Sequence, residues 1–316
     1  MTQDRPERGR GPARQVLDRL EAGLARLGVG LTRLVGGRRF SRAAGALGAV
    51  AGRWAPPLHR RVAANLALLG RDDDPKALSA EVCRTFAELV VDYWRLDELA
   101  ARPDAIAVEG AEHLLRPLRA GRGVVIAGAH FGAWEAVRLA ARKLAGRDCA
   151  LIYRAFNNPR VDAIAQERIR YGGAPVLHKG PAGARALLRH VGRGGMAMVL
   201  VDQRQTGSPL LPFLGREAET ATAAADLALR FDAALITARA RRDPDGDRFH
   251  AVFEPEVPPG DALAMMREVN DRVSAWVAAT PGQWFWLHRR WTLRARGERI
   301  RAARRGDVDA DPATRA

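Results

Sequence analysis

The sequence holds a histidine and a glutamate five positions apart, in the segment His130-Phe-Gly-Ala-Trp-Glu135. A carboxylate on one imidazole nitrogen fixes the tautomer and raises the basicity of the other nitrogen, which can then take a proton from an attacking hydroxyl. We therefore predict His130 as a general base and Glu135 as the carboxylate that orients it. On one continuous helix the two residues would point roughly 140° apart. The pair therefore requires His130 in a loop before the helix, where its ring can fold back toward Glu135.

Two glycines, Gly128 and Gly132, flank the histidine. They permit a tight turn and the close approach of a substrate. Backbone N–H groups at the start of the following helix are expected to favour a developing oxyanion.

Short apolar runs alternate with amphipathic segments from about Ile106 onward. The predicted strands are Val124–Ala127, Ala150–Tyr153, Pro175–Leu177, Met196–Val201, Leu235–Ala238 and, after a turn, Phe249–Phe253. The predicted helices are Ala133–Leu144, Pro159–Tyr171, Pro181–Val191, Ala221–Phe231 and Asp261–Ala279. This alternation predicts an α/β fold with a central, mostly parallel sheet that helices cover on both faces.

Polar side chains follow the carboxyl ends of several predicted strands, where open α/β sheets bind their ligands. Arg154 follows one strand, His178 another, and Asp202-Gln203-Arg204 a third. His178 is the weakest candidate among them. The predicted substrate-binding residues are Gly132, Trp134, Arg154, Asp202, Gln203 and Arg204.

Other chemistries lack their motifs in this sequence. It has no GxSxG elbow for a serine hydrolase and no P-loop or GxGxxG after a strand for a nucleotide. The HxxxxE spacing is not HExxH, so we predict no metal site and no cofactor. Cys83 and Cys149 lie far apart in segments that look buried, which argues against a disulfide and against a thiol nucleophile.

The residue pattern of the N-terminal third of the chain predicts helices. Between Val16 and Val35 leucines recur every three or four positions with charges between them, which indicates an amphipathic helix that lies in a membrane interface or packs on its own domain. Asp74 and Pro75 mark the start of a further helix with the apolar stripe Val82, Phe86, Leu89, Val90 and Tyr93.

We expect four regions along the chain: a disordered N-terminus at 1–14, a helical membrane-associating region at 15–100, an α/β domain at 101–292, and a basic, disordered tail at 293–316. No run reaches the roughly 20 apolar residues that a spanning helix needs.

The formal net charge is +15 and the isoelectric point about 11.2. Such a charge fits nucleic acid, anionic lipid or an acidic protein as a partner, although a GC-rich genome would also enrich arginine.

Five segments together resemble the late acyltransferases of lipid A biosynthesis, the lauroyl/myristoyl type, within the HxxxxE lysophospholipid acyltransferase superfamily. The resemblance covers roughly residues 40–292, although members commonly begin with a hydrophobic anchor and often carry Asn where Ala133 stands. The segments are His130–Glu135, Tyr153-Arg154 with Asn157-Asn158-Pro159, Val201–Arg204, Pro212–Arg216 and Pro281–Trp291.

The resemblance implies a membrane-associated enzyme that transfers a fatty acyl chain from acyl carrier protein to a hydroxyl of a lipid A precursor, without a covalent enzyme intermediate. Arg154 is then the candidate for a donor or acceptor phosphate. The tryptophans of the last segment, with Arg289 and Arg290, are interpreted as structural and interfacial, and His288 as structural. The expected location is the cytoplasmic face of the inner membrane, peripheral or monotopic, with no nucleic acid as a partner.

Two alternatives stay open. The same chemistry suits another acceptor, such as a lysophospholipid, an ornithine lipid or a phosphoinositol mannoside. A non-catalytic basic protein that binds membranes or nucleic acid is the more remote alternative, because it would have no use for the polar residues at the strand ends.

Overall fold

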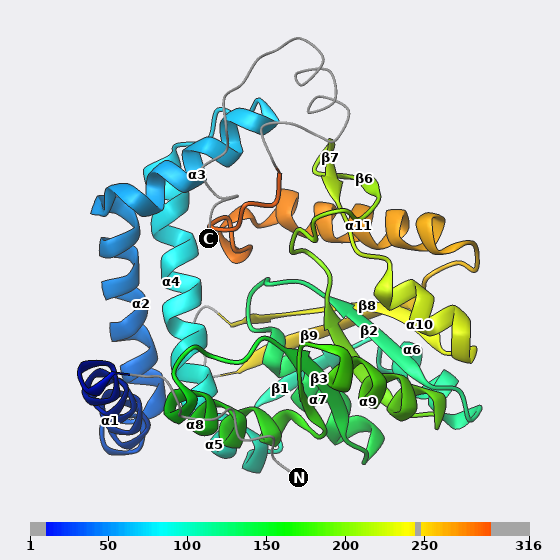
Figure 1. Cartoon of the computed structure of the whole chain (residues 1–316), viewed down its shortest axis with the longest axis horizontal. Helices are drawn as coiled ribbons and strands as arrows, with labels where there is room; N and C mark the ends of the chain where they lie inside the picture. The colour runs from blue at the N-terminus through cyan, green and yellow to red at the C-terminus, as the bar shows by residue number, and fades with distance from the viewer. Residues whose placement is uncertain (1–10, 244–247, 292–316) are drawn as a thin grey trace.

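The computed structural model describes residues 11–243 and 248–291 of the chain. Its centre is a seven-stranded sheet in the order β1-β9-β8-β2-β5-β3-β4, with helices around it (Figure 1). The strands are β1 (Ile106–Glu109), β2 (Val124–Gly128), β3 (Cys149–Tyr153), β4 (Val176–His178), β5 (Met196–Leu200), β8 (Ala234–Arg242) and β9 (Phe249–Glu256). Neighbours pair in parallel except β8 and β9. The predicted α/β class is confirmed.

Helices account for most of the remaining described residues. They are α1 (Pro12–Val35), α2 (Gly37–Trp54), α3 (Pro56–Leu69), α4 (Pro75–Trp94), α5 (Leu96–Ala101), α6 (Ala111–Arg119), α7 (Trp134–Ala145), α8 (Pro159–Ile169), α9 (Pro181–Gly192), α10 (Ala223–Phe231) and α11 (Ala262–Ala279), with the 3₁₀ turns η1 (Arg170–Gly172) and η2 (Pro281–Gln283). A two-stranded hairpin, β6 (Leu210–Phe213) and β7 (Arg216–Glu219), stands apart from the main sheet.

The central strands are buried on both faces, which is why they appear in the sequence as unbroken apolar runs. All five residues of β2 are buried. Val125 and Ala127 face a core that includes side chains of α9, α10 and α11, whereas Val124 and Ile126 face one that includes side chains of α6 and α7. Because β2, β5, β3 and β4 pair in parallel, their carboxyl ends meet at one edge of the sheet.

Small residues allow α2 and α4 to pack closely. A Cβ at Gly48 would lie 2.4 Å from the carbonyl oxygen of Cys83, and one at Gly52 would lie 2.2 Å from that of Ser79. Both glycines are on α2 and both carbonyls are on α4, so the two helices touch backbone to backbone. In Figure 1 they run side by side along one flank of the molecule.

Helix α4 begins as the sequence predicts. The Asp74 side chain accepts a hydrogen bond from the N–H of Lys76, and Pro75 occupies the first turn. Val82 and Leu89 are buried, but Val90 is 48% exposed, so its place in the predicted core stripe is wrong.

Helix α1 turns its apolar side outward. Its buried residues are Asp18, Ala22, Gly28 and Thr32, whereas Leu24 is 67% and Leu34 83% exposed. The amphipathic helix is confirmed; within the described residues Leu17, Leu20, Leu24, Leu27 and Leu34 are exposed, and Leu31 is half-buried.

The helix begins at Pro12, so residues 12–14 are helical rather than disordered. Residues 1–10 of the N-terminal segment and the predicted C-terminal tail lie outside the described residues. Among the described helices, none combines the length and apolar character that crossing a membrane requires.

Candidate active site

His130 lies in the loop between β2 and α7, as predicted. Gly132 in this loop has φ +53°, and a Cβ there would lie 2.3 Å from the carbonyl oxygen of Ala240. Its N–H donates to the carbonyl of Gln283 at 2.8 Å. Gly132 therefore permits close approach of the protein's own backbone rather than of a substrate. Ala240 and Gln283 both contact the loop at this residue.

The backbone donors at the start of α7 are partly engaged. The N–H of Gly132 is bonded to Gln283, and the N–H of Ala133 donates to the carbonyl of Ala240 at 2.9 Å. These two groups are not available to an oxyanion, contrary to what the sequence suggests for this turn.

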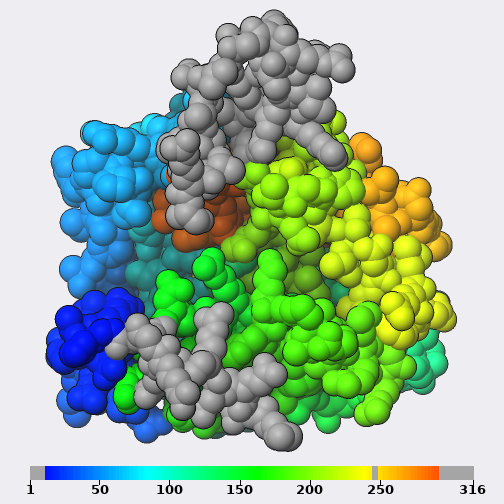
Figure 2. Space-filling view, viewed as in Figure 1, coloured from blue at the N-terminus to red at the C-terminus, as the bar shows by residue number. Residues whose placement is uncertain are grey.

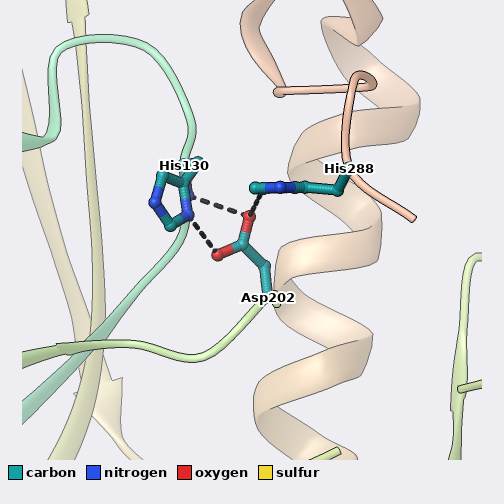
Figure 3. A group of neighbouring side chains, drawn as sticks. All are labelled: His130, Asp202 and His288. Carbon is teal, nitrogen blue, oxygen red and sulfur yellow. Dashed lines mark hydrogen bonds and ion pairs between the residues drawn. The ribbon is translucent and has the colours of Figure 1, made fainter. Parts of the chain in front are cut away.

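The carboxylate on the His130 ring belongs to Asp202, which follows β5. His130 Nδ1 lies 2.9 Å from Asp202 Oδ1, and the backbone N–H of His130 donates to Oδ2 at 2.9 Å (Figure 3). An ionised carboxylate only accepts hydrogen bonds, so in the neutral imidazole Nδ1 carries the proton and Nε2 has the lone pair. The His130 side chain is 19% exposed and that of Asp202 is fully buried.

Two further groups hold Asp202. Trp284 Nε1 donates to Oδ2 at 2.8 Å, and His288 Nε2 lies 3.7 Å from the same oxygen. Burial alone would raise the pKa of Asp202, but the charge and hydrogen bonds of His130, with the nearby His288, outweigh it and keep that pKa well below its usual range. The carboxylate therefore stays ionised at neutral pH.

His288 belongs to this cluster, although the sequence indicates only a structural role for it. Figure 3 shows Asp202 between the two histidines, each from a different segment of the chain. The rings of His288 and His130 pack edge to face with centroids 4.9 Å apart. The signal available in the sequence was that His288 falls in the last of the five family-like segments.

Glu135 does not contact His130, which corrects the predicted pair. Its Oε2 accepts from Arg138 Nη1 at 2.7 Å, and its Oε1 accepts from the Tyr93 hydroxyl at 3.2 Å. Glu135 is 1% exposed, and burial raises its pKa while Arg138 and Tyr93 lower it. The physical reason is its position in the first turn of α7, which directs it into the core, where Arg138 of the same helix needs a counter-charge.

Two hydrogen bonds and one ring contact nevertheless link Glu135 to His130 through Tyr93 and Trp134. The Tyr93 hydroxyl that donates to Glu135 accepts a hydrogen bond from Trp134 Nε1 at 2.9 Å. The Trp134 ring packs edge to face on His130, with centroids 5.1 Å apart. Trp134, a predicted substrate-binding residue, is 8% exposed and serves as a wall for the His130 ring.

The other predicted binding residues are spread along the edge. Gln203 is exposed, with its Nε2 3.4 Å from His130 Nε2, so it stands at the open side of the ring. Arg204 Nε donates to Glu219 at 2.6 Å in the β6–β7 hairpin and is engaged there. Arg154 is exposed and makes no hydrogen bond or ion pair within the described residues. It follows β3, two strands from β2, which is about 10 Å away.

His178 ends β4 close to Arg154. Its Nε2 lies 2.9 Å from the Tyr153 hydroxyl and 3.2 Å from Asp162. Asn158 of the same family-like segment caps α8 and donates to the Asp18 carbonyl of α1 at 2.9 Å. This segment therefore joins the edge of the sheet to α1.

The tryptophan cluster is core and not interfacial, which corrects that part of the interpretation. Trp284 and Trp286 have no exposed surface, and Trp291 is 4% exposed. Arg290 is also buried and donates to the Glu219 carbonyl at 2.7 Å, and burial lowers its pKa to about 10. Arg289 is exposed.

The geometry suits proton transfer better than metal binding or thiol chemistry. His130, Asp202 and His288 offer ligand atoms within 4.8 Å of one another. In the neutral ring Nδ1 of His130 donates to Asp202 at 2.9 Å, so the contact that these two residues make is a hydrogen bond. Burial raises the pKa of Cys83 and brings that of Cys149 to about 11, so neither favours a thiolate; Cys83 is only partly buried.

Comparison with known proteins gives a family match and curated relatives. The family model described as bacterial lipid A biosynthesis acyltransferase matches residues 16–292. The lipid A biosynthesis lauroyltransferase of Escherichia coli K12 is 27% identical over 198 residues, covering 60% of this chain and 63% of that protein. The lipid A biosynthesis palmitoleoyltransferase of the same organism is 27% identical over 203 residues, with the same coverage. The alignments thus span somewhat less than two thirds of either relative.

Proposed function

Because the chain belongs to the bacterial lipid A biosynthesis acyltransferase family, we propose that it is an O-acyltransferase acting on a lipid A precursor. The reaction transfers a fatty acyl chain from the thioester of acyl carrier protein to a hydroxyl of the precursor. One observation carries the proposal: the His130 ring has a buried carboxylate on Nδ1, and its Nε2 faces the exposed Gln203 amide, 3.4 Å away, at the edge of the sheet.

In the proposed reaction, Nε2 of His130 takes the proton of the acceptor hydroxyl as its oxygen attacks the thioester carbonyl carbon. A C–O bond forms, the C–S bond breaks, and the leaving thiolate receives the proton from His130. Asp202 stays ionised throughout and stabilises the imidazolium that forms in between, as an aspartate does in other base triads.

Gln203 and Arg154 are the groups placed to meet the substrates. The Gln203 amide lies at the open nitrogen of His130, where it is able to donate to the developing oxyanion once the acceptor hydroxyl displaces it. Arg154 has no partner among the described residues and stands about two strand spacings from β2. That reach suits a phosphate of the donor or acceptor rather than the reacting carbonyl.

Glu135 acts indirectly in this mechanism. It fixes Tyr93, Tyr93 fixes Trp134, and Trp134 supports one side of the His130 ring. We therefore assign Glu135 as a positioning residue and not as the partner of the base.

The acyl donor and the acceptor both fit the charge of the chain. Acyl carrier protein and phosphorylated glycolipids are acidic, and the chain carries +15. Coenzyme A is the competing donor. A lysophospholipid, an ornithine lipid or a phosphoinositol mannoside is the competing acceptor. The cluster of Asp202, His288 and Trp134 around His130 would be without purpose in a protein that only binds membranes or nucleic acid.

We further propose that α1 and α2 rest on the cytoplasmic face of the inner membrane. Residues 12–54 contain eight arginines and two acidic residues. Exposed apolar side chains stand among them: Val16, Leu17, Leu20, Leu24, Leu27, Leu34, Val35, Leu47, Val50 and Trp54. Apolar and cationic groups on one surface suit an anionic lipid interface. Figure 2 shows this flank in blue at one side of the molecule.

The test joins an assay to lipid analysis. Purified protein should acylate a lipid A precursor from acyl carrier protein, and His130→Ala should abolish turnover while retaining the unfolding transition. Mass spectrometry of lipids from a strain without the gene should show lipid A lacking one secondary acyl chain. Intact lipid A with a change in another lipid would assign one of the competing acceptors, and turnover retained by His130→Ala would refute the assignment of the base.

A further inference from the structure

A pocket of about 380 Å³ opens between α2, α4 and the carboxyl end of β8, and it reaches the His130 loop at Gly132 and Ala133. Arginines dominate its polar lining. They are Arg38, Arg42, Arg84 and Arg242, against the carboxylates of Glu88, Asp92 and Asp243. No step of the proposed reaction uses this pocket.

The carboxylates of the pocket are largely committed to one arginine. Arg242 forms an ion pair with the buried Asp92, and its Nε lies 3.7 Å from Glu88. Burial raises the pKa of Asp92 to about 6 and also raises that of Glu88, while the neighbouring arginines lower both. Two of the three lining carboxylates, those of Asp92 and Glu88, are therefore paired with Arg242.

Arg42 and Arg84 are the two lining cations that remain available. Both are exposed, one on α2 and one on α4, and neither makes a hydrogen bond or ion pair within residues 11–243 and 248–291. Both line the same pocket, and the charge of each lowers the pKa of Glu88, so both lie near that carboxylate. Two guanidinium groups facing one space match the oxygens of a phosphate, which accepts paired N–H donors.

A buried hydroxyl points to the same kind of ligand. Ser41 lines the pocket, is 2% exposed, and its Oγ has no hydrogen-bond partner. A buried polar atom without a partner costs free energy, so native proteins pair most such atoms. A hydroxyl beside two unpaired guanidinium groups completes a donor set for an oxyanion.

We propose that this pocket binds a phosphate group of the lipid acceptor, an inference that rests on the proposed function. Helix α2 gives the reason for choosing the acceptor. By the helical repeat, Arg42 lies roughly 100° from the buried Ser41 and roughly 80° from the exposed Val50. An acceptor whose chains stay in the bilayer beside the outer face of α2 brings its headgroup to the Arg42 edge, and from there along the loop to His130.

The experiment compares Arg42→Ala/Arg84→Ala with Arg185→Ala/Arg189→Ala, which removes two exposed arginines of α9 outside the pocket. Acceptor KM should rise roughly 10- to 100-fold in the first double variant, as expected for lost charge-assisted hydrogen bonds. Its kcat should change less than about threefold on the same grounds, because the base is untouched. The α9 variant should match the wild type.

A matched pair of acceptors makes the test specific. The wild type should prefer the phosphorylated acceptor over its dephosphorylated form, and Arg42→Ala/Arg84→Ala should lose that preference. A rise in donor KM instead would place the donor's phosphate in the pocket and overturn the proposal, as would an unchanged preference.

A binding measurement separates this inference from the proposed function. Titration calorimetry with a phosphorylated glucosamine disaccharide that lacks acyl chains should show phosphate-dependent binding in the wild type and not in Arg42→Ala/Arg84→Ala. Such binding without any acyl transfer would retain the pocket and refute the enzyme. Equal binding by both proteins, or none by either, would overturn the pocket.

Discussion

Asp202 is the residue on which the orientation of His130 depends. It holds the ring nitrogen and the backbone of His130 with its two oxygens, and Trp284 fixes it from behind. In Asp202→Asn an amide replaces the anion, so the wrong tautomer of His130 is favoured and the imidazolium loses its counter-charge. We expect kcat to fall about 10²- to 10⁴-fold with little change in KM. Steady-state kinetics of the purified variant checks this.

For Glu135 we expect substitution to lower the stability of the fold more than the rate of catalysis. Glu135→Ala leaves Arg138 buried without its carboxylate, and breaking a buried ion pair costs about 3–5 kcal/mol. We expect a large loss in the free energy of unfolding, measured in urea, with a smaller loss of kcat than in Asp202→Asn at temperatures where the variant is folded. A stable variant with the larger loss of kcat would make Glu135 the orienting carboxylate after all.

The ionised state of Asp202 also predicts a pH dependence of stability. Its pKa in the folded chain is held well below the unfolded value of about 3.9. A depressed pKa contributes stability above the unfolded pKa, and this stability is lost as the pH falls toward the folded value. The difference in unfolding free energy between wild type and Asp202→Asn should therefore be constant above about pH 5 and shrink below about pH 4. Urea unfolding of both proteins across this pH range tests the prediction. A difference that stays constant would show that the pKa of Asp202 is not lowered in the folded chain.

At this scale the sequence predicts a histidine oriented by a carboxylate, but it does not predict which carboxylate contacts the ring. His130, Asp202 and Gln203 follow strands whose carboxyl ends share an edge, and sheet geometry predicts that proximity. The choice between Asp202 and Glu135 depends on where the first turn of α7 directs Glu135. That direction is set by the buried Arg138 and by Tyr93, whose positions follow only from the packed core.

At the scale of elements, the α2–α4 contact depends on glycine. In Gly52→Ala the new Cβ would lie 2.2 Å from the Ser79 carbonyl oxygen, a backbone atom that cannot rotate away. Overpacking of this kind costs about 1–3 kcal/mol, so we expect a lower free energy of unfolding. Gly30→Ala in α1 is the control, because no atom lies within 4 Å of its Cβ. There alanine should stabilise the helix by about 0.5–1 kcal/mol. Equal effects of the two substitutions would mean that α2 does not pack on α4 as described.

Elements with a strong local pattern were predictable, and others were not. The strands Val124–Gly128 and Met196–Leu200 are buried on both faces, so apolar runs mark them within a residue or two. The hairpin of β6 and β7 was not predicted from the sequence, because its strands have only four residues each. Its turn residues are Leu214 and Gly215, both at positive φ. Strand β1 is equally short and alternates only partly buried with exposed residues.

At the scale of the whole molecule, α1 packs with its polar side inward and its leucines outward. The inner side of α1 is made of small and polar residues that contact α8 and the helices beside it, so its leucines are left outside. The sequence pattern predicts an amphipathic helix but not which side faces inward. Asn158 determines which side of α1 faces inward. Its side-chain amide donates to the Asp18 carbonyl and to the Glu21 carboxylate of α1, and so holds the polar side of the helix against the sheet domain.

This outward apolar surface predicts where the protein meets lipid. Leu20 and Leu24 of α1 are 60% and 67% exposed, and Leu229 and Leu263, at the far end of the fold on α10 and α11, are 48% and 44% exposed. Leu20→Glu/Leu24→Glu should abolish flotation with anionic vesicles, because two charges would enter the apolar layer and oppose the anionic surface. Leu229→Glu/Leu263→Glu adds the same charge elsewhere and should float like the wild type.

Salt then separates the two forces at this surface. Flotation of the wild type should weaken as ionic strength rises, since the arginine contribution is screened over about 8 Å at physiological salt. A residual fraction that persists at high salt reports the leucines, and this fraction should be absent from Leu20→Glu/Leu24→Glu at the same salt concentration. If the α10/α11 variant lost binding instead, or if both variants floated normally, α1 would not be the membrane-facing helix, and the acceptor would have to reach His130 from another side.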